Sequence, residues 1–195
     1  MTADVGGPTT DAEFAAGFQR DPELFTAVYD RYFRDVYRYV AGRLDTEAAN
    51  DIAAETFLVA FGDRARFDPR RGGLRPWLFG IATNLVARHR RKEARHYAAL
   101  ARQAPEPLAY SEENRIIDAV AAGRLRPLLV KALATLSRGE RDVVLLLALG
   151  QLSHEEISQT LGIPSGTVGS RLSRARKKLH QVIDQEAVND PINER

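Results

Sequence analysis

Hydrophobic side chains recur every three or four positions in the segment that follows Asp21. The residues that share this spacing are Phe25, Val28, Tyr29, Tyr32, Phe33, Val36, Tyr37 and Val40. Such a period places all of them on one face of an α-helix. Asp21 followed by Pro22 has the form of a helix N-terminus, with Asp21 as the capping residue. The pattern therefore predicts a first helix from this cap to about Leu44.

Two further helices are predicted in the N-terminal half. The second covers residues 47–61 and has an apolar side opposite an acidic side. Residues 66–73 contain a proline and two adjacent glycines, which is typical of a loop. Pro76 can then open a third helix that runs to about residue 95. Three helices of this length can enclose a hydrophobic core.

The periodic pattern weakens over residues 96–114, where prolines interrupt any long helix. We therefore expect a flexible linker in this part of the chain. Regularly spaced leucines return over residues 125–136 and predict another helix. A nearly continuous apolar run at residues 143–149 predicts a helix that is buried on most sides and that Gly150 ends.

The most specific local pattern lies over residues 153–180. A Ser-x-x-Glu capping box at Ser153 predicts a short helix that ends near Leu161. A tight turn at residues 162–164 leads to a second helix, which Ser165 is expected to cap. The spacing predicts that the inward face of this second helix consists of Val168, Leu172, Ala175 and Leu179. Its other face is rich in Arg and hydroxyl side chains, so the pair predicts a helix-turn-helix whose second helix enters a DNA major groove.

Charge is strongly segregated along the chain although the formal net charge is only +2. Residues 1–63 sum to −7, whereas residues 64–102 sum to +9. Residues 164–180 contain five bases and no acid. Clustered Lys and Arg side chains favour contact with nucleic-acid phosphates. The sequence therefore predicts two positive surfaces, one in each half of the chain.

Composition argues against several other classes of protein. The chain has no run of about 18 apolar residues and no export signal near Met1, so we expect a cytoplasmic protein without membrane insertion. It has no cysteine and only four scattered histidines, so we expect neither a metal site nor another cofactor. No Gly-rich phosphate loop and no nucleophile beside a base is present, and we expect no enzyme activity.

Four stretches stand out, at residues 51–61, 74–84, 136–149 and 154–176, and together they resemble the signature regions of bacterial RNA polymerase sigma factors of the extracytoplasmic-function (ECF) group. Residues 51–61, DIAAETFLVAF, and residues 74–84, LRPWLFGIATN, are similar to the two signatures of sigma domain 2. Residues 136–149 and 154–176 are similar to sigma domain 4. The matches follow one another in the order and spacing of the family, so together they are more specific than either alone.

The resemblance implies an all-α fold of two small helical domains joined by a flexible linker. The expected order is an N-terminal tail or short helix, the helical bundle of sigma domain 2, the linker, sigma domain 4 with its helix-turn-helix, and a C-terminal tail. The predicted bounds of these five parts are 1–20, 21–96, 97–124, 125–182 and 183–195.

Members of this family bind core RNA polymerase, direct it to promoters and help to open them. The resemblance implies that domain 2 docks on the coiled-coil clamp of the largest polymerase subunit through Asp51, Glu55 and Phe57. It also implies contact with the polymerase flap, an anti-sigma factor as a further partner, and association with the nucleoid in the holoenzyme. In the alternative interpretation, the two carboxylates form a solvated helix face and Phe57 lies in the core.

The loop at residues 66–73 and the third helix resemble the part of domain 2 that binds the −10 element as a melted single strand. Single-stranded bases are held by aromatic or Arg planes in a positive groove, and an everted base needs a polar pocket. The candidate residues are Phe67, Arg70, Arg71, Arg75, Trp77, Asn84, Arg88, Arg90 and Arg91. Trp77 also fits a core position. Pro76 departs from the family pattern but is compatible with a first helical turn.

The helix that begins near Ser165 resembles the helix of domain 4 that recognises the −35 element. Arg can bond guanine edges, and Ser or Thr can bond bases or phosphates. The candidate residues are Ser165, Thr167, Ser170, Arg171, Ser173, Arg174, Lys177 and Lys178. Among these, we expect Arg171 and Arg174 to contact bases and the two lysines to contact phosphates.

Two other functions remain open on the sequence alone. A helix-turn-helix regulator that acts without core polymerase would bind its operator tightly as a free protein, whereas a sigma factor would bind free DNA poorly. That alternative leaves the basic residues 64–95 without a role. In a second alternative, a helical adaptor uses its charged faces only for protein contacts. Salt-dependent binding to forked promoter DNA with core polymerase would exclude the adaptor.

Overall fold

The structure is a computed structural model that describes residue 17 and residues 23–101 and 125–189. All regular secondary structure in these residues is helical, which confirms the predicted all-α fold. Most of the predicted linker lies outside the described residues, as do most of the predicted N-terminal tail and the proposed capping residue Asp21.

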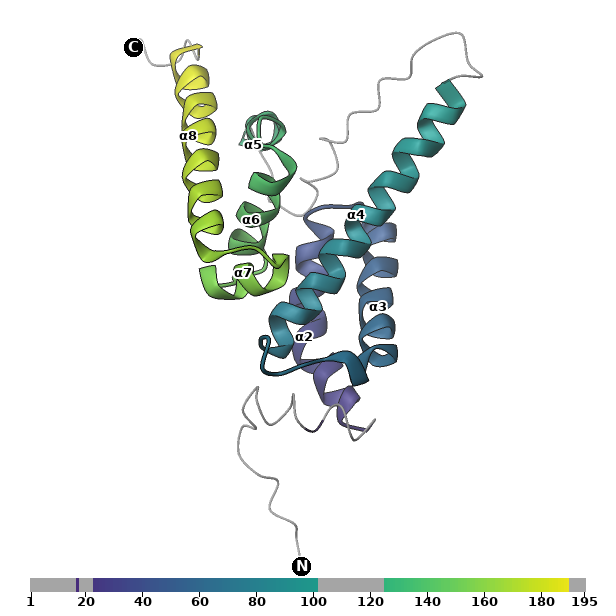
Figure 1. The fold of residues 1–195 in the computed structure, drawn as a ribbon. Coiled ribbons are helices and arrows are strands. Elements are labelled where there is room, and N and C mark those ends of the chain that lie inside the picture. The colour runs from purple at the N-terminus through teal and green to yellow at the C-terminus, as the bar shows by residue number, and fades with distance from the viewer. Residues whose placement is uncertain (1–16, 18–22, 102–124, 190–195) are drawn as a thin grey trace, which may run out of the picture.

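Three long helices form the N-terminal bundle (Figure 1). They are α2 (Leu24–Ala41), α3 (Thr46–Gly62) and α4 (Leu74–Ala101), with a 3₁₀ turn, η1 (Arg64–Arg66), after α3. Asp45 caps α3 because its side chain accepts a hydrogen bond from the backbone N–H of Ala48. Helix α2 begins at Leu24, later than predicted, and Glu23 at its N-cap makes no side-chain capping bond.

Helix α4 is longer than predicted at both ends. It begins at Leu74, so Pro76 lies within its first turn, where the missing N–H costs nothing. It continues to Ala101, so the first residues assigned to the linker are helical. The segment after residue 86 is rich in Ala and Arg, which are good helix formers and carry the helix beyond the bundle.

The C-terminal half contains α5 (Leu125–Ala134), α6 (Arg138–Ala148), α7 (His154–Leu161) and α8 (Ser165–Asn189). Both the capping box at Ser153 and the end of α7 at Leu161 are confirmed. Gly162 ends α7 with a φ of 61°, a left-handed conformation that glycine adopts without steric cost.

Three local features of this half differ from the sequence predictions. Ser137 and Glu140 form a second capping box, which opens α6 and was not predicted. Ser165 is the first residue of α8 rather than the residue before it, and the carbonyl of Pro164 accepts the first backbone hydrogen bonds of that helix. Helix α8 also extends to Asn189, so it takes up half of the predicted C-terminal tail.

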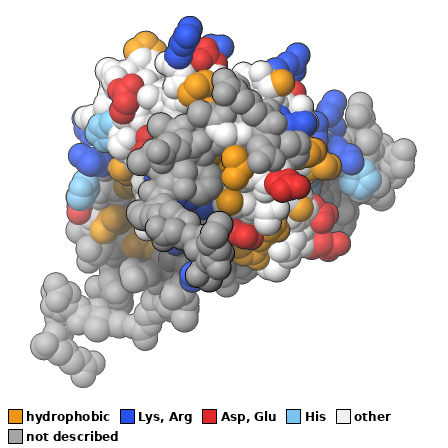
Figure 2. All heavy atoms as spheres, turned by 90° about the horizontal axis from the view of Figure 1, so that it is seen from below, with side chains coloured by type: hydrophobic (Ala, Val, Ile, Leu, Met, Phe, Trp, Pro, Cys, Tyr) orange, Lys and Arg blue, Asp and Glu red, His pale blue; other side chains and the backbone are white. Residues whose placement is uncertain are grey.

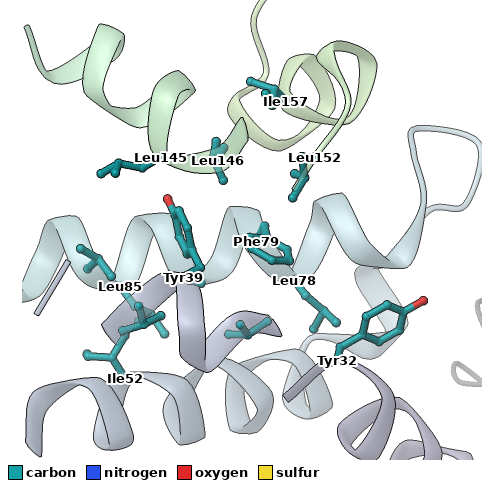
Figure 3. Close-up of a cluster of buried hydrophobic side chains, with 14 of the residues drawn as sticks. Tyr32, Tyr39, Ile52, Leu78, Phe79, Leu85, Leu145, Leu146, Leu152 and Ile157 are labelled. Atoms are coloured by element: carbon teal, nitrogen blue, oxygen red, sulfur yellow. The ribbon is translucent and has the colours of Figure 1, made fainter. Parts of the chain in front are cut away.

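One hydrophobic core runs through both halves of the protein. Figure 3 shows Tyr39 of α2 and Phe79 of α4 pointing toward side chains of the C-terminal half, and Leu146 of α6 and Leu152 face them. All four side chains are at most 1% exposed. Gly150 completes this contact, because a Cβ at that position would lie 2.9 Å from the Phe79 ring. The two halves are therefore closely packed against each other in this conformation.

A buried polar cluster lies within the same boundary. The guanidinium of Arg43, which follows α2, donates hydrogen bonds to the Asp142 carboxylate of α6 and to the Tyr39 hydroxyl. The Tyr39 hydroxyl also lies 2.9 Å from the Thr83 hydroxyl of α4. Arg43 and Asp142 are 3% and 7% exposed, so water screens their attraction little. Burial raises the pKa of Tyr39, which keeps its hydroxyl protonated.

We expect Asp142→Ala to destabilise the protein strongly, because it leaves the buried guanidinium of Arg43 without its carboxylate. Breaking a buried pair in this way costs about 3–5 kcal/mol. The matched control is Asp63→Ala, which removes an exposed ion pair with Arg66 and should cost less than about 1 kcal/mol. Urea unfolding of both variants measures the difference. Equal losses in the two variants would contradict the importance of the buried pair.

Candidate nucleic-acid interface

The acidic face of α3 is only partly available for a partner. Asp51 is exposed, whereas the Glu55 carboxylate already pairs with the guanidinium of Arg88 on α4. Phe57 is 2% exposed, and its ring packs against the aromatic rings of α2. The predicted direct contact of Phe57 with polymerase is therefore replaced by the alternative, in which the residue belongs to the core.

Leu58 is a surface feature that the sequence prediction missed. It is 71% exposed, far more than the other large apolar side chains among the described residues. Leu58 lies three positions after Glu55 and seven after Asp51, so all three share one face of α3. That spacing was visible in the sequence, but an apolar residue inside a hydrophobic helix gave no sign of pointing outward.

The predicted −10 loop forms one wall of a cavity of about 390 Å³. Phe67 and Trp77 both line this cavity, and their ring centroids are 5.2 Å apart. Phe67 is only 3% exposed, so in this conformation it is not the open stacking surface that was predicted. Gln159 and Gly162 of the C-terminal half form part of the opposite wall. Both remaining loop candidates, Arg70 and Arg71, are exposed.

Arg75, another predicted −10 residue, contacts the C-terminal half instead of solvent. Its guanidinium donates hydrogen bonds to the carbonyls of Gly150 (2.7 Å) and Gln151 (3.2 Å). It also lies 3.6 Å from a carboxylate oxygen of Glu156 on α7. Next to this contact, the Thr160 hydroxyl of α7 donates a hydrogen bond to the carbonyl of Pro76 in α4. Together, the contacts of Arg75 and Thr160 hold α7 against the start of α4.

The remaining −10 candidates lie along α4 on two faces. Asn84, Arg88 and Arg91 are exposed and recur at helical spacing, which places them on one side of the helix. Arg90 is partly buried and donates a hydrogen bond to the carbonyl of Arg43. The exposed stripe can meet a negatively charged strand in this conformation, whereas Arg90 faces the boundary between the halves.

Helix α8 presents most of the predicted −35 residues to solvent. Val168, Leu172 and Ala175 are buried as predicted and hold the helix against its neighbours. The exposed candidates are Ser165, Ser170, Ser173, Arg174 and Lys177, and the partly buried ones are Thr167, Arg171 and Lys178. Arg176 is also exposed and extends this basic face, although the prediction omitted it.

Glu140 of α6 holds two of the α8 cations. Its carboxylate accepts a 2.7 Å hydrogen bond from Lys178 and lies 3.4 Å from Arg174. The hydrogen bond from Lys178, together with those of the Ser137 capping box, lowers the pKa of Glu140 to about 2. Glu140 is therefore charged at neutral pH and pairs with both cations in this conformation.

On the face shown in Figure 2, Lys and Arg side chains lie at several places around the rim, and Asp and Glu side chains lie among them. Among the described residues, no cluster of His, Asp and Glu could hold a metal ion. None of the helices in those parts of the chain has the length and apolar content needed to cross a membrane.

Comparison with known proteins gives matches in both halves. Residues 28–96 match the family described as Sigma-70 region 2, and residues 126–179 match Sigma-70, region 4. The chain is 35% identical to the ECF RNA polymerase sigma factor SigC of Mycobacterium tuberculosis, over 75% of this chain and 76% of that protein. It is 32% identical to the ECF RNA polymerase sigma factor SigW of Bacillus subtilis, over 83% and 89%.

Solved structures share the arrangement of the helices. The structure of CnrH in complex with the cytosolic domain of CnrY matches with a TM-score of 0.64 and 25% identity, over 90% of this chain and 97% of that chain. The sigma factor RpoE of Bartonella quintana, in complex with the anti-sigma factor NepR, matches with a TM-score of 0.61 and 23% identity, over 82% and 96%. The second likeness concerns the fold alone.

The low pKa of Glu140 predicts how stability depends on pH. Its folded-state pKa of about 2 lies below the ordinary value of 4.5, so this carboxylate stabilises the fold above about pH 5 and loses that contribution as the pH falls toward 2. Glu140→Gln keeps a capping side chain but removes the charge. We expect the variant to be less stable at pH 7, with the difference shrinking at pH 3, as measured by urea unfolding. An equal difference at both pH values would contradict this role.

Proposed function

Because the chain belongs to the ECF RNA polymerase sigma factors, we propose roles for its individual surfaces in promoter recognition. The protein is a transcription initiation factor, which binds core RNA polymerase and directs it to promoters. Such factors act by binding and not by catalysis. The observation that carries the residue assignments is the amphipathic character of α8. Its exposed face consists of serines and cations, and its opposite, apolar face is buried.

In this proposal, α8 enters the major groove at the −35 element. Arg174 and Arg171 contact base edges, while Lys177 and the newly identified Arg176 contact phosphates. Glu140 restrains Arg174 and Lys178 in the free protein. DNA must therefore displace the Glu140 carboxylate before Arg174 and Lys178 can both bind the DNA. The free energy needed for this displacement disfavours binding to arbitrary sequences.

The exposed stripe on α4 and the arginines of the preceding loop hold the melted −10 strand. A protein that binds unpaired bases better than paired ones shifts the duplex toward the open form by that difference in affinity. Flipping a base costs a few kcal/mol, and stacking on an aromatic side chain returns roughly 1–3 kcal/mol per base. The cavity beside Phe67 and Trp77 would receive such a base once Gln159 moves away.

Reading both elements requires the two halves to separate. The elements lie about 25 base pairs apart, which is roughly 85 Å along the duplex at about 3.4 Å per base pair. In the described conformation α7 packs directly on α4, and Arg75 is engaged by the backbone of the C-terminal half. We therefore assign this conformation to the free protein, before it binds polymerase. An anti-sigma protein is a further proposed partner that would keep the same surfaces covered.

Polymerase capture is assigned to the outer face of α3, with Leu58 as an apolar anchor beside Asp51. Interface residues of this kind are large, exposed in the free protein and surrounded by polar side chains.

The −35 assignment predicts different consequences for two neighbouring cations. Arg174→Ala should weaken binding of polymerase holoenzyme to the preferred −35 sequence by about tenfold or more, but should affect unrelated sequences little. Lys177→Ala should weaken binding to all sequences equally and reduce the salt dependence. Binding titrations at several salt concentrations distinguish these outcomes. Uniform weakening by Arg174→Ala would reassign that residue to the phosphate backbone.

The polymerase assignment predicts that Leu58→Ala lowers the affinity for core polymerase at least tenfold, because it removes an exposed apolar anchor. The matched control is Ile183→Ala, which shortens another exposed apolar side chain, 46% exposed and on α8. Equilibrium binding to core polymerase and runoff transcription measure both variants. If Ile183→Ala and Leu58→Ala behave alike, α3 is not the docking face. A wild-type factor that directs no transcription even from a pre-melted template would contradict the proposed function itself.

A further inference from the structure

Helix α6 packs against α8, the helix to which −35 recognition is assigned in the proposed function (Figure 1). At one point of this contact, the guanidinium of Arg171 on α8 lies directly beside Gly139 in the first turn of α6. A Cβ on Gly139 would lie 2.9 Å from the Cζ and Nη1 atoms of Arg171 and 3.2 Å from its Nε. Because Cβ atoms do not approach other atoms that closely, any larger residue at position 139 would push the guanidinium out of its place.

The backbone of α6 does not require a glycine at position 139. The glycines with a left-handed backbone among the described residues are Gly72 and Gly162, and Gly139 is not one of them. Inside a helix, glycine is less favourable than alanine because it loses more backbone freedom on folding. The feature of the structure that uses the missing side chain is therefore the space that the Arg171 guanidinium occupies.

Arg171 gains little for the fold from this place. Its side chain is partly buried, yet it makes no hydrogen bond or ion pair with any described residue. Arg174 and Lys178 on the same helix, by contrast, both pair with the Glu140 carboxylate. The partial positive charge at the start of a helix also disfavours a cation beside the first turn of α6. Departures from local rules of this kind are expected where a residue serves function.

We propose that Gly139 is a positioning residue for −35 recognition, because it gives the Arg171 guanidinium a defined place beside α6 with its donors unused. The inference rests on the proposed role of α8. An arginine side chain has several rotatable bonds, and holding it in place beforehand reduces the entropy that is lost when it bonds a base edge. DNA displaces no internal partner of Arg171, whereas it must displace Glu140 from Arg174. Gly139 thus affects the choice of base pair through Arg171.

The substitution Gly139→Ala tests this role because it adds one methyl group and removes no charge. The guanidinium is the flexible end of a side chain, so it moves more easily than the backbone of α6. We expect the variant to be at least as stable as the wild type in urea unfolding, because alanine favours the helix. We also expect polymerase holoenzyme with this variant to lose about tenfold in discrimination at the −35 base pair that Arg171 reads. General damage to the fold would lower stability as well.

A double-mutant cycle shows whether Gly139 acts through Arg171. Holoenzymes with the wild type, Gly139→Ala, Arg171→Ala and the double variant are titrated with a promoter and with its single-base −35 variants. We expect both single variants to lose discrimination at the same base pair, and the double variant to lose no more than Arg171→Ala alone. As a comparison, Gly62→Ala at the end of α3 adds a Cβ that meets nothing within 4 Å. At saturating core polymerase it should leave −35 discrimination unchanged.

The outcomes separate the positioning role from the proposed function. Full discrimination by Gly139→Ala, with a loss in Arg171→Ala, would overturn the positioning role and leave the −35 assignment of α8 intact. A lower stability of Gly139→Ala, a further loss in the double variant, or an equal loss in Gly62→Ala would also overturn it. Undiminished discrimination by Arg171→Ala would remove Arg171 from the −35 surface, and the positioning role with it. Runoff transcription by the wild-type factor tests the proposed function independently of all these results.

Discussion

The structure depends on one buried ion pair between two segments that are distant in the chain. Arg43 and Asp142 are 99 positions apart, yet their side chains pair directly inside the buried boundary between the halves. Hydrophobic side chains such as Phe79 and Leu146 could pack in several orientations, because apolar contact has little directionality. A buried guanidinium tolerates few arrangements, since any slip leaves a desolvated charge. The pair therefore fixes how the C-terminal half sits on the bundle.

The same boundary uses residues that we propose as DNA contacts. Arg75 belongs to the predicted −10 surface, and here its hydrogen bonds go to carbonyls of the C-terminal half. Glu140 holds the cations of α8 in a similar way, within the C-terminal half. Each of these contacts is polar and can be exchanged for a phosphate or a base at moderate cost, whereas an apolar contact could not. In our proposal the free protein satisfies these cations internally, and promoter DNA replaces the internal partners.

Local features could be predicted from the sequence because their causes are local. The capping box at Ser153, the left-handed glycine at position 162 and the inward face of α8 all follow from spacings of a few residues. The contact between the halves could not be predicted in this way, because nothing near Arg43 or Asp142 in sequence indicates its partner. The neighbours Phe57 and Leu58 were equally hard to assign from the sequence. Packing against α2 decides that Phe57 is buried and Leu58 is exposed.

We propose that the two halves are packed together in the free protein and separate on polymerase. The chain contains no cysteine, so Asn50→Cys on α3 and Gln181→Cys on α8 provide two unique labelling sites, both exposed. Distances between spin labels at these positions should show one short population in the free factor. Adding core polymerase and promoter DNA should replace it with a longer one. An unchanged distance in the complete complex, or a long distance in the free protein, would contradict the account.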